Sequence, residues 1–176
     1  MDQTGNVISA LPDRHASGRP YSQLIAVKHW ADRGLYDAVG KSLDRLSREE
    51  VSIMLRILDH IHVVDRIFQH HLQGRPHPYR AARSEAPPEL SALAHGAREV
   101  DDWYASYVEG LAADEFEQPV DFVFTSGKPA RMRRGEIVLH VCLHGSYHRG
   151  NAGAILQLKG LAPGRDSITD FFEYAN

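Results

Sequence analysis

Four segments of this chain carry apolar residues at the spacing of an α-helix, and clear stop signals separate them. Ser47 followed by Glu50 is a capping-box pattern, so a helix should begin there, and Gly74 with the prolines after it should end that helix. Four helices of twenty or more residues predict an all-α fold, a four-helix bundle. The predicted helices span about residues 22–46, 47–73, 87–113 and 135–159.

Shorter elements complete the predicted fold. Helical periodicity is lost over residues 120–132, where a Ser-Gly-Lys turn separates two short segments, and this predicts a small β-hairpin insert between the third and fourth helices. Residues 166–174 can form one last short helix. Residues 1–20 lack periodicity and predict a flexible N-terminal arm, which leaves residues 21–176 as a single domain.

Composition excludes several classes of partner. The formal net charge of −3 gives no reason to expect nucleic acid, and one short basic group near the hairpin lacks the aromatic side chains that stack on bases. No apolar run is long enough to span a bilayer, so no membrane association is expected. A single cysteine, Cys142, excludes an internal disulfide and suits the cytoplasm. The basic group comprises Lys128, Arg131, Arg133 and Arg134.

Histidine is the one residue type in clear excess, with eleven in 176 residues. At about 100° per residue, His60 falls at one edge of the apolar arc of the second helix. His62 falls on the far side, together with Asp59, Arg66 and Gln69. We therefore expect His60 to face the core and His62 to face solvent.

The fourth helix carries two further histidines on its apolar stripe. His144 and His148 are one turn apart in an HxxxH pattern, close enough to share a metal ion. Buried imidazoles are unfavourable without partners, and one divalent cation would satisfy three of them. The alternative is a set of core histidines satisfied by ordinary hydrogen bonds. The stripe contains Ile137, Val141, His144, His148, Asn151 and Ile155.

Other polar side chains near this stripe have several possible roles. His140 lies one turn before His144 and could be a fourth ligand, an orienting group or a substrate contact. Tyr147 could orient a substrate. Arg149 could bind a carboxylate of a cosubstrate, although a structural salt bridge is the better interpretation. The remaining histidines, His15, His29, His70, His71, His77 and His95, are expected at the surface.

The opposite face of the fourth helix carries small residues, Cys142, Ser146, Gly150, Gly153 and Gln157. This face could pack against another helix of the same chain or form a homodimer contact. Cys142 projects away from His144, so we expect it to be neither a ligand nor a nucleophile.

Two segments carry a resemblance to a known family. Residues 57–68 read ILDHIHVVDRIF and residues 140–151 read HVCLHGSYHRGN. With these segments the chain resembles the DinB (damage-inducible, YfiT-like) family from about Tyr21 to its C-terminus. The resemblance implies a four-helix bundle in which His60, His144 and His148 bind a divalent metal ion, zinc or nickel, often in a homodimer. It also implies kinship with thiol-dependent S-transferases and isomerases.

Two functions follow as hypotheses. The first is a metal-dependent enzyme, for which the resemblance suggests an S-transferase that uses a low-molecular-weight thiol and a small-molecule substrate. The second is a non-catalytic metal- or ligand-binding module of a stress response, whose site a fourth ligand would close. No acidic residue is expected on the inward stripes of the second and fourth helices, so a general base beside the metal would have to come from the first or third helix or from loops. Asp101 and Asp102 on the third helix are available, but the acidic cluster around them is most simply a solvated face.

Overall fold

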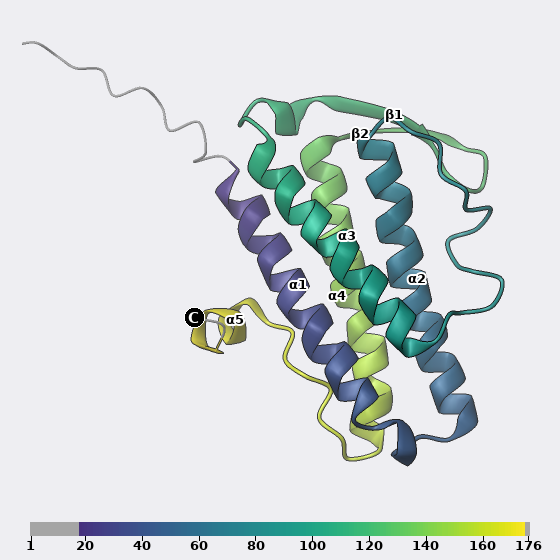
Figure 1. The fold of residues 1–176 in the computed structure, drawn as a ribbon. Coiled ribbons are helices and arrows are strands. Elements are labelled where there is room, and N and C mark those ends of the chain that lie inside the picture. Colours follow the sequence, from purple (N-terminus) through teal and green to yellow (C-terminus); the bar gives the residue numbers. More distant parts are fainter. Residues whose placement is uncertain (1–17, 175–176) are drawn as a thin grey trace, which may run out of the picture.

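The computed structural model describes residues 18–174 and is mostly helical (Figure 1). A small antiparallel hairpin of two strands joins the third long helix to the fourth, as predicted. Two short 3₁₀ turns lie outside the α-helices, at Leu43–Arg45 and Glu115–Glu117. The main elements are α1 (Arg19–Gly40), α2 (Arg48–Leu72), α3 (Leu90–Gly110), β1 (Pro119–Val123), β2 (Pro129–Arg133), α4 (Arg134–Leu158) and α5 (Ile168–Tyr174).

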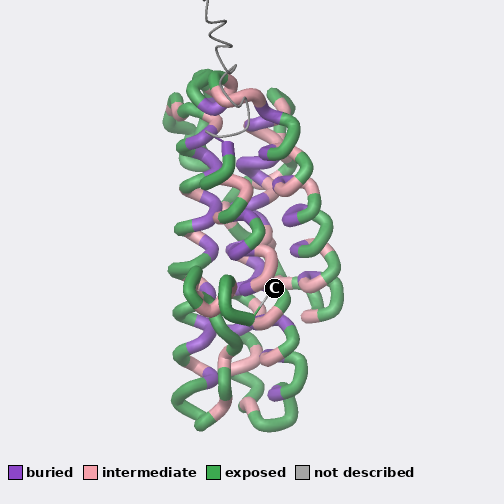
Figure 2. The backbone as a smooth tube through the Cα atoms, turned by 90° about the vertical axis from the view of Figure 1, so that its left-hand side faces the viewer, coloured by how far each residue is buried: buried purple, intermediate pink, exposed green. Residues whose placement is uncertain are grey.

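The four long helices pack lengthwise around a shared core. Each of α1 and α2 contacts both α3 and α4, so α1 and α2 lie diagonally opposite each other. Buried residues line the inner sides of the helices along their whole length (Figure 2). Tyr104, Phe116 and Ile137 centre one apolar cluster near the hairpin, and Leu58, Val39 and Leu156 belong to another near the opposite end.

One predicted helix boundary is confirmed and two others differ from the prediction by a few residues. At the start of α2 the predicted capping box is present, with the Glu50 amide donating to Ser47 Oγ and the Ser47 amide donating to Glu50 Oε2. The first helix ends at Gly40 rather than near residue 46, and Ser42 beyond it donates its hydroxyl to the Ala38 carbonyl. The third begins at Leu90 rather than at residue 87. Pro88 disfavours helical backbone at residue 87, and Glu89, the N-cap, has non-helical angles of φ −59° and ψ 151°.

The N-terminal arm predicted over residues 1–20 lies outside the described residues except for its end, where α1 already begins at Arg19. Within residues 18–174, no helix is both long and apolar enough to cross a membrane.

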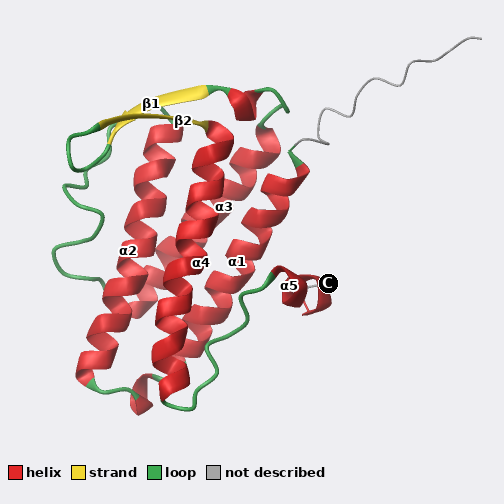
Figure 3. Ribbon diagram, turned by 180° about the vertical axis from the view of Figure 1, so that it is seen from behind, coloured by secondary structure: helices red, strands yellow, loops and turns green. Residues whose placement is uncertain are grey.

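The hairpin lies across one end of the helices (Figure 3). Its strands pair in register from Pro119 opposite Arg133 to Val123 opposite Pro129, and Gly127 takes the positive φ of 82° that the turn requires. Phe122 is buried beneath the hairpin, with its ring 5.6 Å from that of Phe68 on α2. The hairpin therefore closes the core at this end.

A cluster of buried charges lies between the long helices. The Lys28 ammonium on α1 contacts three carboxylates, those of Asp32 at 2.7 Å, Asp65 on α2 at 2.8 Å and Asp101 on α3 at 2.5 Å. Burial alone would lower the pKa of Lys28, but the three carboxylates together raise it well above its ordinary value. Lys28 is therefore a fixed cation shared by three helices.

Arg149 brings α4 into the same cluster. Its guanidinium donates to Asp32 Oδ1 at 3.0 Å and makes two hydrogen bonds of 2.9 Å to Asp166 after α4. Gly145 permits this approach, since a Cβ there would lie 2.9 Å from Arg149 Nη1 and 3.5 Å from Lys28 Cε. The structural interpretation of Arg149 as a salt-bridge residue is confirmed.

Three predictions about polar residues are wrong. Asp101 was expected in solvent and is buried. No acidic residue was expected on the inner side of the second helix, but Asp65 of α2 is buried there. Asp59 and Gln69 are buried, and His62 is half-buried against Gly96 of α3, which lowers the pKa of His62 to about 4 through loss of hydration. The reason is that α2 packs against both α3 and α4, so more than one stripe of it is covered.

Replacing Lys28 by Met keeps the length of the side chain but leaves three buried carboxylates without their shared ammonium. We expect the free energy of unfolding at pH 7 to fall by about 3–5 kcal/mol, measured by urea denaturation. Lys41→Met, an exposed change just beyond α1, should alter it by less than ~0.5 kcal/mol.

The fall in the free energy of unfolding caused by Lys28→Met should be smaller at acidic pH. Buried carboxylates without a cation have raised pKa values in the folded state, so proton uptake stabilises the folded variant. This stabilisation is fully present below about pH 4 and is lost as the pH rises through the raised pKa values. An equal loss at acidic and alkaline pH would contradict the assignment of Lys28 as the compensating charge.

Candidate metal centre

His60 of α2 meets His144 and His148 of α4. The three ring centroids lie 4.5–4.8 Å apart, and one nitrogen from each ring lies within 4.8 Å of the others. These three are the one group among residues 18–174 whose histidine, cysteine or acidic side chains converge closely enough to hold a metal ion. The prediction that His60 faces His144 and His148 is therefore met by the geometry.

The two helices position these rings by simple periodicity. His144 and His148 are one turn apart on α4, and α4 lies directly beside α2 along most of its length. All three side chains are partly buried, as expected for residues that replace apolar groups at a helix contact.

A backbone carbonyl fixes the tautomer of His60. The Nδ1 of His60 lies 2.6 Å from the Ala82 carbonyl oxygen, which can only accept, so Nδ1 carries the hydrogen. In the neutral ring Nε2 then holds a lone pair, and it lies 3.0 Å from His144 Nε2. His60 is thus oriented as ligating histidines commonly are.

The loop over residues 73–89 carries Ala82, and Asp59 anchors this loop. Asp59, next to His60 on α2, accepts hydrogen bonds from the Ser84 amide at 2.8 Å and from the Ser84 hydroxyl at 2.6 Å. These bonds hold the loop where the Ala82 carbonyl meets His60. Sequence reasoning missed this role because Asp59 was expected to face solvent.

The electrostatics of the group suit a bound cation. Burial and the neighbouring His148 and His60 lower the pKa of His144 to about 3, so its ring is neutral at ordinary pH. Two nitrogen ligands of one tetrahedral zinc lie about 3.3 Å apart, close to the 3.0 Å between the Nε2 atoms of His60 and His144. The donor set is therefore of a kind that zinc and nickel accept.

An open cavity of about 280 Å³ adjoins the group. His60 and His148 form part of its wall, and the side chains of Arg56 and Arg83 flank it from α2 and the loop. Both arginines are exposed and make no ion pair within the described part of the chain. A small anionic molecule could therefore reach the histidines from this side.

Three other residues were singled out near this site. His140 lies with its ring 4.7 Å from Phe68 and 5.5 Å from His144, and it is not part of the converging group. Tyr147 is 69 % exposed, with its ring 4.9 Å from His148. Arg149 is committed to Asp32 and Asp166, so it is not available to a substrate carboxylate.

Some histidines expected at the surface are partly covered. His71 stacks on Phe122 at 4.5 Å and lies 5.2 Å from His77, and burial lowers the pKa of His71 to about 4. His29 and His70 are also partly buried, His95 is exposed as predicted, and His15 lies outside the described residues.

The small-residue face of α4 is covered in part by the chain itself. Gly153 is buried against Pro163, and Cys142 is buried in the apolar core, where burial raises the pKa of its thiol to about 12. A protonated, enclosed thiol is a poor ligand and nucleophile, as expected.

The fold and the site together define a class: a helical protein in which two neighbouring long helices bring three histidines to one point. A family model described as the DinB family matches residues 21–175. The chain therefore belongs to the DinB family. Searches of curated proteins and of solved structures give no significant match.

Asp59→Ala tests how the loop is held. Without the carboxylate, the Ser84 amide loses its partner, and we expect amide hydrogen exchange over residues 75–88 to rise by about tenfold or more while α2 stays protected. Glu85→Ala, an exposed change in the same loop, serves as the control. Unchanged exchange in Asp59→Ala would show that other contacts hold the loop.

Proposed function

We propose that this chain binds a divalent metal ion, zinc or nickel, through His60, His144 and His148, and that it is a metal-dependent enzyme. The observation that carries the proposal is the convergence of three imidazoles, one of which has its Nδ1 hydrogen committed to a carbonyl and its lone pair turned to the others. Membership of the DinB family supports it independently.

The site has the composition of a catalytic rather than a closed structural centre. Three neutral nitrogen donors leave a coordination position free, and the cavity beside His60 and His148 gives access to it. A divalent metal held this way supplies a Lewis acid that lowers the pKa of a water or thiol towards neutrality. His60 is kept in the required tautomer by Ala82, and Asp59 keeps the loop in place.

The proposed reaction is thiol transfer to a small electrophile. Arg56 and Arg83 at the cavity take the role that Arg149 cannot, which is to bind a carboxylate of the thiol cosubstrate. Tyr147 is exposed beside His148 and is available to orient the second substrate. In this reaction the thiolate sulfur forms a bond to carbon, a leaving group departs with the bonding electrons, and the thiol proton passes to solvent.

The alternative is a non-catalytic metal- or ligand-binding module. A structural site would have a fourth protein ligand, and His140 was the candidate for it. His140 is turned onto Phe68 and does not join the converging group, which favours the enzyme. The four-helix-bundle classification, the homodimer and the cytoplasmic location remain predictions that accompany this proposal.

Metal content tests the binding step. Tag-free protein loaded with zinc or nickel should hold close to one equivalent by mass spectrometry, and His144→Ala/His148→Ala should lose it. A strong chelator should lower the melting temperature of the wild type alone, since a ligand of the folded state stabilises it. His95→Ala, an exposed histidine, is the control. No retained metal in the wild type would refute the proposal.

Turnover tests the enzymatic step. Metal-loaded protein and a carboxylate-bearing thiol such as glutathione should convert monochlorobimane to a fluorescent thioether, with chloride as the leaving group. Arg56→Gln and Arg83→Gln should each raise KM for the thiol by about tenfold with a smaller change in kcat. Arg80→Gln, an exposed arginine in the same loop, should match the wild type. Full metal occupancy without turnover of any thiol would favour the non-catalytic module.

A further inference from the structure

The cavity beside the candidate metal centre has an apolar wall that the proposed carboxylate contact does not use. Ile53 and Ile57 of α2 line this cavity together with His60 and His148. Ile53 is 51 % exposed, and Ile57 is partly buried. Single exposed apolar residues are common on protein surfaces, but these two lie where a molecule must pass to reach the histidines from this side.

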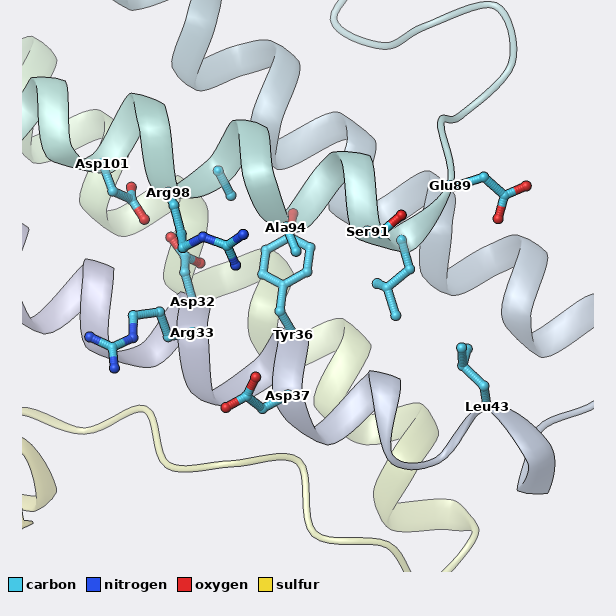
Figure 4. A pocket seen from close by; sticks show the side chains of 12 residues that line it. Asp32, Arg33, Tyr36, Asp37, Leu43, Glu89, Ser91, Ala94, Arg98 and Asp101 are labelled. Atoms are coloured by element: carbon cyan, nitrogen blue, oxygen red, sulfur yellow. The ribbon is translucent and has the colours of Figure 1, made fainter.

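A larger cavity elsewhere in the molecule does not adjoin the histidines. It measures about 530 Å³, against about 280 Å³, and lies between α1 and α3 (Figure 4). Charged side chains from both helices gather at one end of it, among them those of Asp32, Arg98 and Asp101. The described residues that line it include none of the three histidines, so a molecule bound there would not contact the candidate metal centre. The smaller cavity therefore carries the argument.

Helical geometry places the two isoleucines relative to His60. At about 100° per residue, Ile53 lies about 20° from His60 around the axis of α2, and Ile57 lies about 60° from it. At about 1.5 Å per residue, Ile57 is about 4.5 Å and Ile53 about 10.5 Å nearer the start of the helix. The apolar wall therefore runs from His60 towards the start of α2, over about two turns of one helix face.

The charged side chains of the cavity lie beside this wall. Arg56 is about 40° from His60 in the direction opposite to Ile57, and Arg83 comes from the loop after α2. Asp59 also lines the cavity, but both of its carboxylate oxygens accept hydrogen bonds from Ser84. The cavity therefore offers separate surfaces to a carboxylate and to an apolar group.

We propose that Ile53 and Ile57 select the second substrate of the proposed thiol transfer, a role that rests on the proposed function. That substrate is an electrophile with an alkyl chain or an aromatic ring next to its reacting carbon. The apolar group lies on the two isoleucines, and the reacting carbon faces the three histidines. Full burial of one methylene group raises affinity about fourfold, so a chain of several carbon atoms on a partly open wall should raise it about tenfold or more.

Two hydroxamates test the apolar wall by binding rather than by turnover. Acetohydroxamate and octanohydroxamate carry the same metal-binding group and no carboxylate, so they differ only in their alkyl chains. In titration calorimetry on the metal-loaded full chain, octanohydroxamate should bind at least about tenfold more tightly than acetohydroxamate. Equal affinities, or no binding of octanohydroxamate at millimolar concentration, would overturn the proposal.

Metal content measured on the same samples separates the role of the isoleucines from the proposed function. Equal affinities of the two hydroxamates at full metal occupancy would overturn the role of the isoleucines and leave metal binding intact. Protein that retains neither zinc nor nickel would refute the proposed function and the role of the isoleucines together.

A polar substitution locates the alkyl chain of octanohydroxamate. Ile53→Gln places a good helix former at an exposed position, so the fold should persist by circular dichroism. Its affinity for octanohydroxamate should fall at least about fivefold, while that for acetohydroxamate should change less than about twofold. Ile53→Leu, which keeps an apolar side chain, should bind both hydroxamates as the wild type does. Unchanged affinity for octanohydroxamate in Ile53→Gln would overturn the proposal.

Leu143→Gln is the matched control on the other helix. Leu143 is 70 % exposed on α4, next in sequence to His144, and it is not among the residues that line the cavity. Its substitution should change the affinity for octanohydroxamate less than about twofold. A loss in Leu143→Gln as large as that in Ile53→Gln would place the alkyl chain on α4 and overturn the proposal.

Discussion

The contact of the Lys28 ammonium with three carboxylates sets the arrangement of the long helices. It joins α1, α2 and α3, and Arg149 adds α4 through Asp32. Apolar packing tolerates a sliding or turning helix far better than a buried ion cluster does, because a displaced charge is left without a partner. At about 100° per residue, Asp65 is about 140° from His60 on α2, and Arg149 is about 140° from His144 on α4. Fixing the charges therefore also fixes the faces on which the histidines meet.

Much of the helical layout and the histidine group could be predicted from sequence, and the buried charges could not. Helical periodicity placed His60, His144 and His148 on facing stripes, because each stripe is a local property of one helix. The same reasoning put Asp59 in solvent, because it falls opposite the apolar arc of its helix. Asp101 was placed in solvent because acidic residues cluster around it in the sequence. Their burial depends on Lys28 and Ser84, which are distant in sequence. Such pairings need the tertiary structure.

The loop between α2 and α3 shows a second limit of sequence reasoning. Its prolines and glycine predict an irregular segment and nothing more. Its contribution to the candidate metal centre is a backbone carbonyl, that of Ala82, and a carbonyl has no signature in the sequence. The signal that could have found it is Asp59, a polar residue beside a core-facing histidine, whose natural partners are the amide and hydroxyl of a nearby loop residue.

The close approach at Gly145 has a consequence for how the HGSYHRG segment can change over evolution. Within these seven residues, His144 and His148 belong to the candidate metal centre, while Gly145 and Arg149 belong to the buried charge cluster around Lys28. Two sets of requirements are thus interleaved in two turns of one helix. If the chain binds a metal ion as proposed, a lineage that abandons metal binding would free the two histidines to change, yet the glycine and the arginine would stay under selection for folding. Retention of the glycine and arginine alone is therefore the expected mark of a relative that has lost the metal and kept the fold.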